Sequence, residues 1–292
     1  MHLMMFESAE SGQGAARLGL LAGDAVIDLC QADAHLPRDL GALIAAGPAA
    51  LATVAAAAAR APAAAKRPLA AVRPALPIPA PAKCICVGLN YALHAKEGGH
   101  PIPTYPSFFL RVATSLVAAK APVVRPRASE QLDYECELAV VIGKAGRHIA
   151  AARALEHVFG YTLFNDVSVR DFQRKTTQWT PGKNFDATGP TGPVVVTADA
   201  LPPGASGLDI MTRVNGETMQ RSNTSDMIFS VAEIVALLSE FMTLQPGDLI
   251  ATGTPSGVAH ARTPPPWLRP GDVVEVEIER IAVLSNPIIA EA

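Results

Sequence analysis

The alternation of apolar and polar side chains separates two kinds of strand in this chain. Residues 272–279 alternate valine or isoleucine with glutamate, which is the pattern of a strand with one face in the core and the other in water. Residues 138–142 are apolar at every position, which is typical of a strand buried on both faces. Apolar runs predict further strands at residues 84–87, 161–165, 194–197, 210–214 and 249–252.

Helices and turns complete this pattern. Residues 153–158 and 231–241 are the best helix candidates, and Asn215-Gly216 between two strand-like runs predicts a type I′ hairpin. The order of the elements shows no βαβ alternation and no glycine-rich dinucleotide loop. We therefore expect a β-dominated α+β fold.

The start of the chain is organised as a separate unit. Residues 17–21 and 25–29 predict a β-hairpin, and the alanine-rich stretch that follows is predicted to be helical. Five prolines between positions 67 and 82 predict an extended connector. The sequence thus predicts a small N-terminal domain at 1–66, a proline-rich linker at 67–82 and the main domain at 83–292.

Two glutamates precede the apolar run at 138–142. Glu135 and Glu137 lie two positions apart, so in a strand they point to the same face. Such a pair usually lies on a solvated face, but here a strand buried on both sides continues directly from it. Two ionised carboxylates at the end of a buried strand repel each other and need a compensating positive charge, which a divalent cation supplies most simply.

Asp166 adds a third carboxylate at the end of the predicted strand 161–165. An Asn-Asp pair after a strand is by itself also a common turn signal. Joined to Glu135 and Glu137, Asp166 offers three hard oxygen ligands, which suit Mg²⁺ or Mn²⁺ and leave positions for water and substrate. Ca²⁺ is an alternative occupant, whereas zinc prefers nitrogen or sulfur ligands.

His94 and Glu97 are a candidate acid–base pair. At a spacing of three they share one face of a helix, where a carboxylate orients an imidazole so that it takes a proton from water. By spacing alone, an exposed helical pair without a role is the commoner case.

Two turns offer contacts for an anion. Lys183 follows a Pro-Gly turn, and residues 252–257 form a glycine- and hydroxyl-rich turn after a predicted strand. Each binds an anionic oxygen readily through an ammonium, a hydroxyl or a free backbone N–H group. Each also fits an ordinary surface loop.

Charge and composition exclude several functions. The chain has 24 Lys+Arg against 27 Asp+Glu, a formal net charge of −3, and no basic run, so we expect no nucleic-acid partner. We expect no signal peptide, and the alanine-rich stretch is too interrupted by proline and charge to span a membrane. The 4 cysteines lie in apolar settings and fit a reducing cytoplasm.

Six stretches, in this order, resemble the fumarylacetoacetate hydrolase family over roughly residues 84–281. They are VGLNYALHAKE, LDYECELAVVIG, GYTLFNDVSVRDFQ, PGKNFDATGP, VNGETMQ and LQPGDLIATGTPSGV. The resemblance implies a mixed β-sandwich roll and a homodimer. The N-terminal extension is similar to that of the longer members, in which a small β-containing domain precedes the catalytic one.

The same resemblance implies roles for individual residues. It implies the metal ligands Glu135, Glu137 and Asp166, the catalytic residues His94, Glu97 and Lys183, and the substrate-binding residues Arg170, Gln173 and Thr254. The dyad of His94 and Glu97 would lie on a mobile lid helix. One position departs from the family: Arg111 stands where many relatives carry lysine, and its bulkier planar group puts the local anion contact in doubt.

The family supports several reactions on one site. We expect Mg²⁺- or Mn²⁺-dependent hydrolysis of the C–C bond of an acylpyruvate-like 2,4-dioxo acid, of the fumarylacetoacetate or fumarylpyruvate type, as in the catabolism of aromatic compounds. Alternatives are a 2-oxo acid decarboxylase and a dienoate isomerase similar to 5-carboxymethyl-2-hydroxymuconate isomerase. An alternative of another class is a non-catalytic, metal-dependent dicarboxylate-binding protein, which would have no need of the pair His94 and Glu97.

Overall fold

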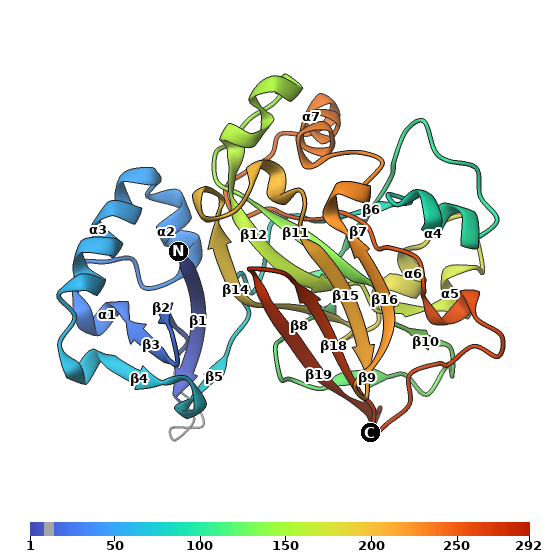
Figure 1. The fold of residues 1–292 in the computed structure, drawn as a ribbon, viewed down its shortest axis with the longest axis horizontal. Helices are drawn as coiled ribbons and strands as arrows, with labels where there is room; N and C mark the ends of the chain where they lie inside the picture. Colours follow the sequence, from blue (N-terminus) through green and yellow to red (C-terminus); the bar gives the residue numbers. More distant parts are fainter. Residues whose placement is uncertain (9–14) are drawn as a thin grey trace.

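The computed structural model describes residues 1–8 and 15–292, and Figure 1 shows a smaller N-terminal part beside a larger, strand-rich part. The N-terminal strands are β1 (His2–Ser8), β2 (Arg17–Ala22), β3 (Ala25–Asp28), β4 (Lys66–Pro68) and β5 (Val72–Pro74), and the helices there are α1 (Leu29–Ala32), α2 (Leu40–Ala45) and α3 (Pro48–Ala59). The predicted hairpin is confirmed as β2–β3. Gly23 supplies the positive φ of its turn.

The proline-rich segment, which was predicted to be an extended connector, also forms strands. It contributes β4 and β5, which pair with β3 and β1. β1 also pairs with β14 (Gly189–Thr197) of the larger part, with His2 opposite Val196. One sheet therefore runs through both parts of the chain, and the division into domains stays a prediction.

The larger part continues this sheet. Its strands here are β6 (Cys84–Gly88), β7 (Ser107–Arg111), β8 (Leu116–Ala118), β11 (Cys136–Ile142), β12 (Val158–Asn165), β14 and β17 (Leu249–Ala251). They follow the order β14-β12-β11-β17-β6-β7, which leaves β7 at the edge. The central strand β11 is buried along its whole length. Its Leu138 and Val140 join one hydrophobic core while Ala139 and Val141 join another, so burial on both faces is confirmed.

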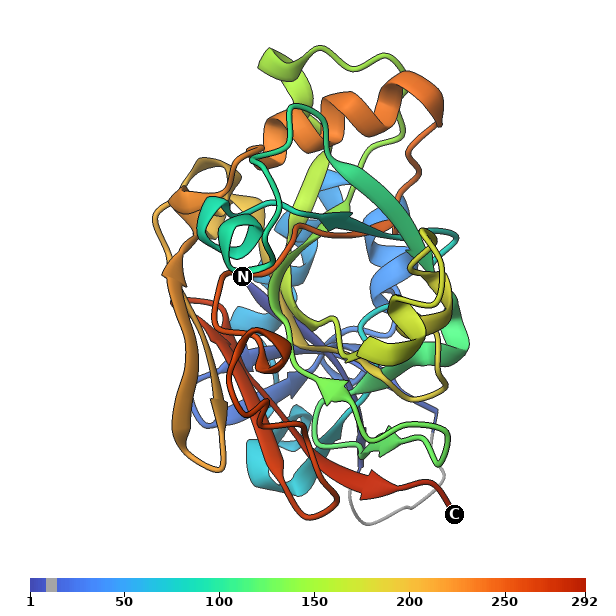
Figure 2. The same ribbon diagram turned by 90° about the vertical axis from the view of Figure 1, so that its right-hand side faces the viewer.

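A second sheet packs against β11, β12 and β14. Its strands are β9 (Val123–Arg125), β15 (Asp209–Val214), β16 (Glu217–Asn223), β18 (Val273–Ile278) and β19 (Ala282–Ala290). Figure 2 shows its orange and red strands at one side of the curled large sheet. Along β18, buried Val274 and Val276 alternate with partly exposed Glu275 and Glu277, which confirms the half-buried pattern. Parallel and antiparallel pairs occur together, and the β-dominated α+β roll is confirmed.

The local predictions of helices and turns met different outcomes. The hairpin at Asn215-Gly216 is confirmed, with positive φ at both residues. α7 (Val231–Phe241) is confirmed, and Ser230 with Glu233 forms a capping box at its start. The helix predicted at 153–158 is confirmed in part: the chain is helical at Ala151–His157, as a 3-10 helix rather than an α-helix, and β12 begins directly at the next residue. Among the residues that the structure describes, every helix is too short or too polar to span a bilayer.

Candidate active site

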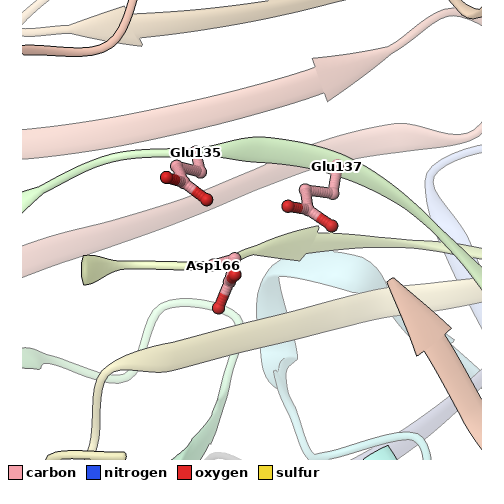
Figure 3. Close-up of side chains that lie close together, drawn as sticks. All are labelled: Glu135, Glu137 and Asp166. Carbon is pink, nitrogen blue, oxygen red and sulfur yellow. The ribbon is translucent and has the colours of Figure 1, made fainter. Parts of the chain in front are cut away.

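Three carboxylates meet where two antiparallel strands end. In the ladder of β11 and β12, Cys136 lies opposite Asn165 and Glu137 lies opposite Phe164. Glu135 directly precedes β11 and Asp166 directly follows β12, and the Asp166 N–H group donates a hydrogen bond to the Glu135 carbonyl at 2.9 Å. Figure 3 shows the three side chains close together, with Glu135 and Glu137 on the side of their strand that faces Asp166. One oxygen from each lies within 4.8 Å of the others, and all three side chains are buried. The three residues predicted as metal ligands are thus brought together.

Cationic side chains bind two of these acids. The Lys183 ammonium lies 2.8 Å from Glu135 and 2.6 Å from Asp166. Arg170 lies 2.6 Å from Glu135, and Arg111 lies 2.5 Å from Asp166. Lys183 ends α6 (Thr180–Lys183), Arg170 begins α5 (Arg170–Gln173), and Arg111 ends the edge strand β7. Part of the compensating charge that the sequence requires therefore comes from the protein itself.

Arg111 makes the anion contact that its bulk had put in doubt. Besides Asp166, its guanidinium donates hydrogen bonds to Ser115 at 3.2 Å, to Thr188 at 2.8 Å and to the Val167 carbonyl at 3.2 Å. A lysine side chain could not make this set of hydrogen bonds.

Glu137 differs from the other two acids. Its Oε2 accepts a hydrogen bond from the Gly253 N–H group at 2.8 Å, and no cationic side chain among the described residues pairs with it. Burial and the neighbouring carboxylates of Asp166 and Glu135 raise the pKa of Glu137 well above its usual range. Burial alone would also raise the pKa of Glu135, but Lys183 and Arg170 lower it to about 2. Glu137 is therefore protonated more easily than Glu135 when no cation is bound.

The balance of charge fits a divalent cation. The buried groups that meet here are Asp133, Glu135, Glu137, Asp166, Arg111, Arg170 and Lys183. With a proton on Glu137, these groups are neutral overall. A divalent cation that displaces this proton leaves one net positive charge, which would attract an anionic substrate. The oxygen donors, together with a Glu137 oxygen that lacks a hydrogen-bond partner among the described residues, fit Mg²⁺ or Mn²⁺.

We predict that cation binding releases a proton from Glu137. Because the pKa of Glu137 is raised, the group stays protonated at pH values above about 4.3 at which a free glutamate is ionised. The affinity for Mn²⁺ should therefore rise with pH, by up to about tenfold per unit below the raised pKa. Calorimetric titrations in two buffers of different protonation enthalpy measure the released proton. A Mn²⁺ affinity that does not change with pH, with no proton released in either buffer, would contradict this assignment.

His94 and Glu97 form a bonded pair on α4 (Ala92–Glu97). The Nδ1 atom of His94 lies 2.7 Å from Glu97 Oε1, and Glu97 Oε2 accepts from the Gly257 N–H group at 2.9 Å. A carboxylate at Nδ1 favours the tautomer with the proton on that nitrogen, which leaves Nε2 as the proton acceptor. The His94 side chain is only 9 % exposed, so the alternative of an exposed pair without a role does not fit.

One cavity of about 670 Å³ joins these groups. All nine predicted site residues line it: His94, Glu97, Glu135, Glu137, Asp166, Arg170, Gln173, Lys183 and Thr254. Its wall also contains Phe109, Trp179, His100, Arg174 and His260, which the sequence analysis did not single out. Their signal in the sequence was weak, because each lies in a loop, in a short 3-10 helix or at an edge strand without a distinctive spacing.

Asp133 lies two positions before Glu135, a spacing that puts both on one face of an extended strand, but it has a different task. It is fully buried and accepts hydrogen bonds from Arg170 at 2.8 Å and from the N–H groups of Ala259 at 2.7 Å and His260 at 3.0 Å. Burial alone would raise the pKa of Asp133, but Arg170 and these donors hold it far below its usual range. Asp133 thereby fixes Arg170 and the loop that carries His260.

Comparisons with known proteins agree with this geometry. The family model described as fumarylacetoacetate (FAA) hydrolase C-terminal matches residues 83–289. The mitochondrial oxaloacetate tautomerase of Xenopus laevis is 40% identical over 291 residues, covering 99% of this chain and 90% of that protein. Two solved structures cover 100% of this chain and are covered fully in turn, each with a TM-score of 0.83. They are a fumarylacetoacetate hydrolase from psychrophilic Exiguobacterium antarcticum (37% identity) and a maleylpyruvate hydrolase from Sphingobium sp. SYK-6 in complex with manganese(II) and pyruvate (30% identity).

Proposed function

The chain belongs to the fumarylacetoacetate hydrolase family, and we propose that it is a divalent-metal-dependent enzyme that interconverts the keto and enol forms of a small 2-oxo dicarboxylate of the oxaloacetate class. The observation that carries this proposal is the common cavity of the three carboxylates, Lys183 and the bonded pair His94 and Glu97. A protein that only binds a dicarboxylate has no need of an oriented base. The similarity to an oxaloacetate tautomerase spans nearly the whole chain, including its N-terminal part.

The proposed chemistry assigns a task to each group. Glu135, Glu137 and Asp166 would hold the cation, which supplies a Lewis acid that polarises the 2-oxo group. His94 Nε2 removes a proton from the carbon next to that group, while Glu97 stabilises the resulting imidazolium. Negative charge then develops on the 2-oxo oxygen.

Side chains around the cavity stabilise this charge and orient the substrate. The Lys183 ammonium is buried, and although burial alone would lower its pKa, Asp166 and Glu135 raise it, so it stays charged beside the developing enolate. Arg170 and Gln173 are the first and last residues of α5 and are joined by a hydrogen bond from the Arg170 guanidinium to the Gln173 side-chain oxygen at 2.9 Å, and this pair would orient the carboxylate next to the 2-oxo group. Returning the proton from His94 completes the interconversion.

The cavity wall also favours a second carboxylate on the substrate. Arg174, His100 and His260 line it, and Arg174 has no ion-pair partner among the described residues. An unpaired guanidinium at the wall of a cavity offers a site for a distal carboxylate. This feature supports a dicarboxylate rather than a monocarboxylate such as pyruvate.

An assay of enol absorbance tests the proposal. Fresh oxaloacetate relaxes slowly between its enol and keto forms, and the protein with Mg²⁺ should speed the loss of ultraviolet enol absorbance, whereas EDTA should remove the effect. The screen should include 2,4-dioxo acids as well. If none of these acids changes faster in the presence of protein and Mg²⁺, the proposal is wrong.

Hydrolysis of a 2,4-dioxo acid is the second candidate. The observation in its favour is the volume of the cavity, about 670 Å³, which exceeds the size of a four-carbon acid and leaves room for a longer acyl chain and a water molecule. His94 would then take its proton from water. Release of pyruvate, followed with a coupled dehydrogenase, distinguishes hydrolysis from tautomerisation.

We also propose that the chain forms a homodimer through the face around the edge strand β7. Leu110 on this strand and Val112 directly after it are about half exposed, as are Tyr105 and Phe241 beside it. Phe108 of β7 contacts both of these rings, at 5.9 and 5.8 Å between centroids. An unpaired edge with apolar side chains is a favourable surface for association.

We therefore predict a dimer at micromolar concentration, and a monomer for Leu110→Glu. Sedimentation velocity measures both, and Leu93→Glu on α4 serves as a matched control for removing an exposed leucine. A monomeric wild-type protein would rule out the dimer.

A further inference from the structure

One buried amide joins the strand of the metal ligands to the wall of the cavity. Gln220 lies on β16 and is 1% exposed. Its Oε1 accepts hydrogen bonds from Cys136 N–H at 3.1 Å and from the Thr212 hydroxyl at 2.6 Å. Its Nε2 donates to Thr254 Oγ1 at 2.9 Å and to the Pro255 carbonyl at 2.7 Å. All four hydrogen-bonding capacities of the amide are therefore used.

The two backbone partners determine which way this amide faces. Cys136 N–H can only donate, and the Pro255 carbonyl can only accept. If the amide of Gln220 were turned by 180°, its NH₂ group would face the N–H donor and its oxygen would face the carbonyl. Both contacts would be repulsive, so the orientation with Nε2 toward Thr254 is fixed by groups whose polarity cannot change.

This orientation determines the role of the Thr254 hydroxyl. An NH₂ group can only donate, so Thr254 Oγ1 must accept from Gln220. Its own proton has no acceptor among the described residues, while Thr254 lines the cavity. A hydroxyl that already accepts a hydrogen bond from the protein is left as a donor toward whatever occupies the cavity.

We propose that Gln220 is a positioning residue that makes Thr254 a hydrogen-bond donor to an acceptor oxygen of the bound acid. Gln220 itself does not line the cavity, so it acts through Thr254. Because it also holds Cys136, which stands between Glu135 and Glu137, it sets the distance between the metal ligands and this donor. The identity of the acceptor as a carboxylate or 2-oxo oxygen rests on the proposed function, whereas the direction of the hydrogen bond does not.

A double-mutant cycle tests this proposal. The probe is oxalate, a planar dianion with acceptor oxygens only, titrated by calorimetry into the full-length protein loaded with Mn²⁺. Gln220→Met and Thr254→Val should each weaken oxalate binding by about 10- to 100-fold, as expected for loss of a hydrogen bond to a charged group. The double variant should bind oxalate no more weakly than Thr254→Val alone, because Gln220 acts only through the Thr254 hydroxyl, which Thr254→Val already removes.

Two controls separate positioning from general damage. Thr254→Ser retains the hydroxyl and should bind oxalate within about threefold of the wild type. Thr212→Val removes a partner of Gln220 but leaves the two backbone groups that fix its orientation, so its oxalate affinity should also be nearly unchanged. A merely structural role of Gln220 would instead give additive losses in the double variant, and that result would overturn the proposal.

A second variant covers the case in which Gln220→Met does not fold. An ionised Gln220→Glu side chain still accepts from Cys136 and Thr212 but does not donate to Thr254, so oxalate binding should fall as for Thr254→Val. Wild-type oxalate affinity in this variant would overturn the proposal. The proposed function and the role of Gln220 can fail separately. If the wild type binds oxalate and the double-mutant cycle is non-additive as expected, but the protein turns over no 2-oxo acid, the proposed function is refuted and the role of Gln220 stands.

Discussion

Glu137→Gln should abolish Mg²⁺-dependent turnover while leaving the cation-free protein folded. Glutamine keeps the shape of the side chain and the acceptor for Gly253 N–H, but it removes the negative charge that balances the second charge of the cation. Turnover should fall by at least about 10³-fold, the upper range for loss of a group that acts only in the transition state. Enol absorbance assays and calorimetric Mn²⁺ titration measure both effects.

The stability of this variant distinguishes a metal ligand from a structural acid. Burial and the neighbouring acids raise the pKa of Glu137, so ionising it in the cation-free protein costs stability, and glutamine avoids that cost. The thermal midpoint without cation should therefore be no lower than that of the wild type, whereas the rise on adding Mn²⁺ should disappear. Glu130→Gln, an exposed position five residues before Glu135, is the matched control and should behave as the wild type. A variant that retains activity, or a wild type unaffected by EDTA, would refute the metal site.

The sequence predicted the acids of this site better than it predicted their partners. The apolar run after Glu137 indicated a strand buried on both faces, and β11 has that environment. Which residues lie opposite one another depends on the register of β11 and β12, which places Cys136 against Asn165 and cannot be read from either strand alone. The three acids were therefore expected from residue type and position, while their convergence had to come from the sheet.

The cationic partners depended on long-range packing. Arg111 meets Asp166 from the end of β7, a strand whose Ser-Phe-Phe-Leu-Arg sequence lacks a clear alternation and was not predicted. Strand periodicity alone also misleads at Asp133. Its spacing puts it on the same strand face as the two glutamates, but its side chain contacts Arg170 and the loop at Ala259. The local sequence pattern thus predicts where strands and helices form. The chemistry of the site depends instead on ion pairs between segments that are distant in the sequence.

His94→Ala should lower the turnover of a 2-oxo acid by about 10²- to 10⁴-fold, the usual contribution of a positioned general base. The affinity for the substrate should change little, because the side chains that hold the acid, Lys183 and Arg170 among them, stay in place. A loss in kcat with an unchanged KM is therefore the expected result in the enol absorbance assay. Lys96→Ala, on the exposed side of the same helix, is the matched control and should retain wild-type turnover.

Glu97→Gln extends the same prediction to the partner of His94. An amide has a single acceptor oxygen, so it cannot accept from both the protonated His94 Nδ1 and the Gly257 N–H group, and it carries no charge to stabilise the imidazolium that forms when His94 takes a proton. Turnover should therefore fall, though less than for His94→Ala. If His94→Ala turns over substrate at the wild-type rate, proton transfer must come from another group in the cavity. His260, which stands next to the buried carboxylate of Asp133, would then be the first residue to replace.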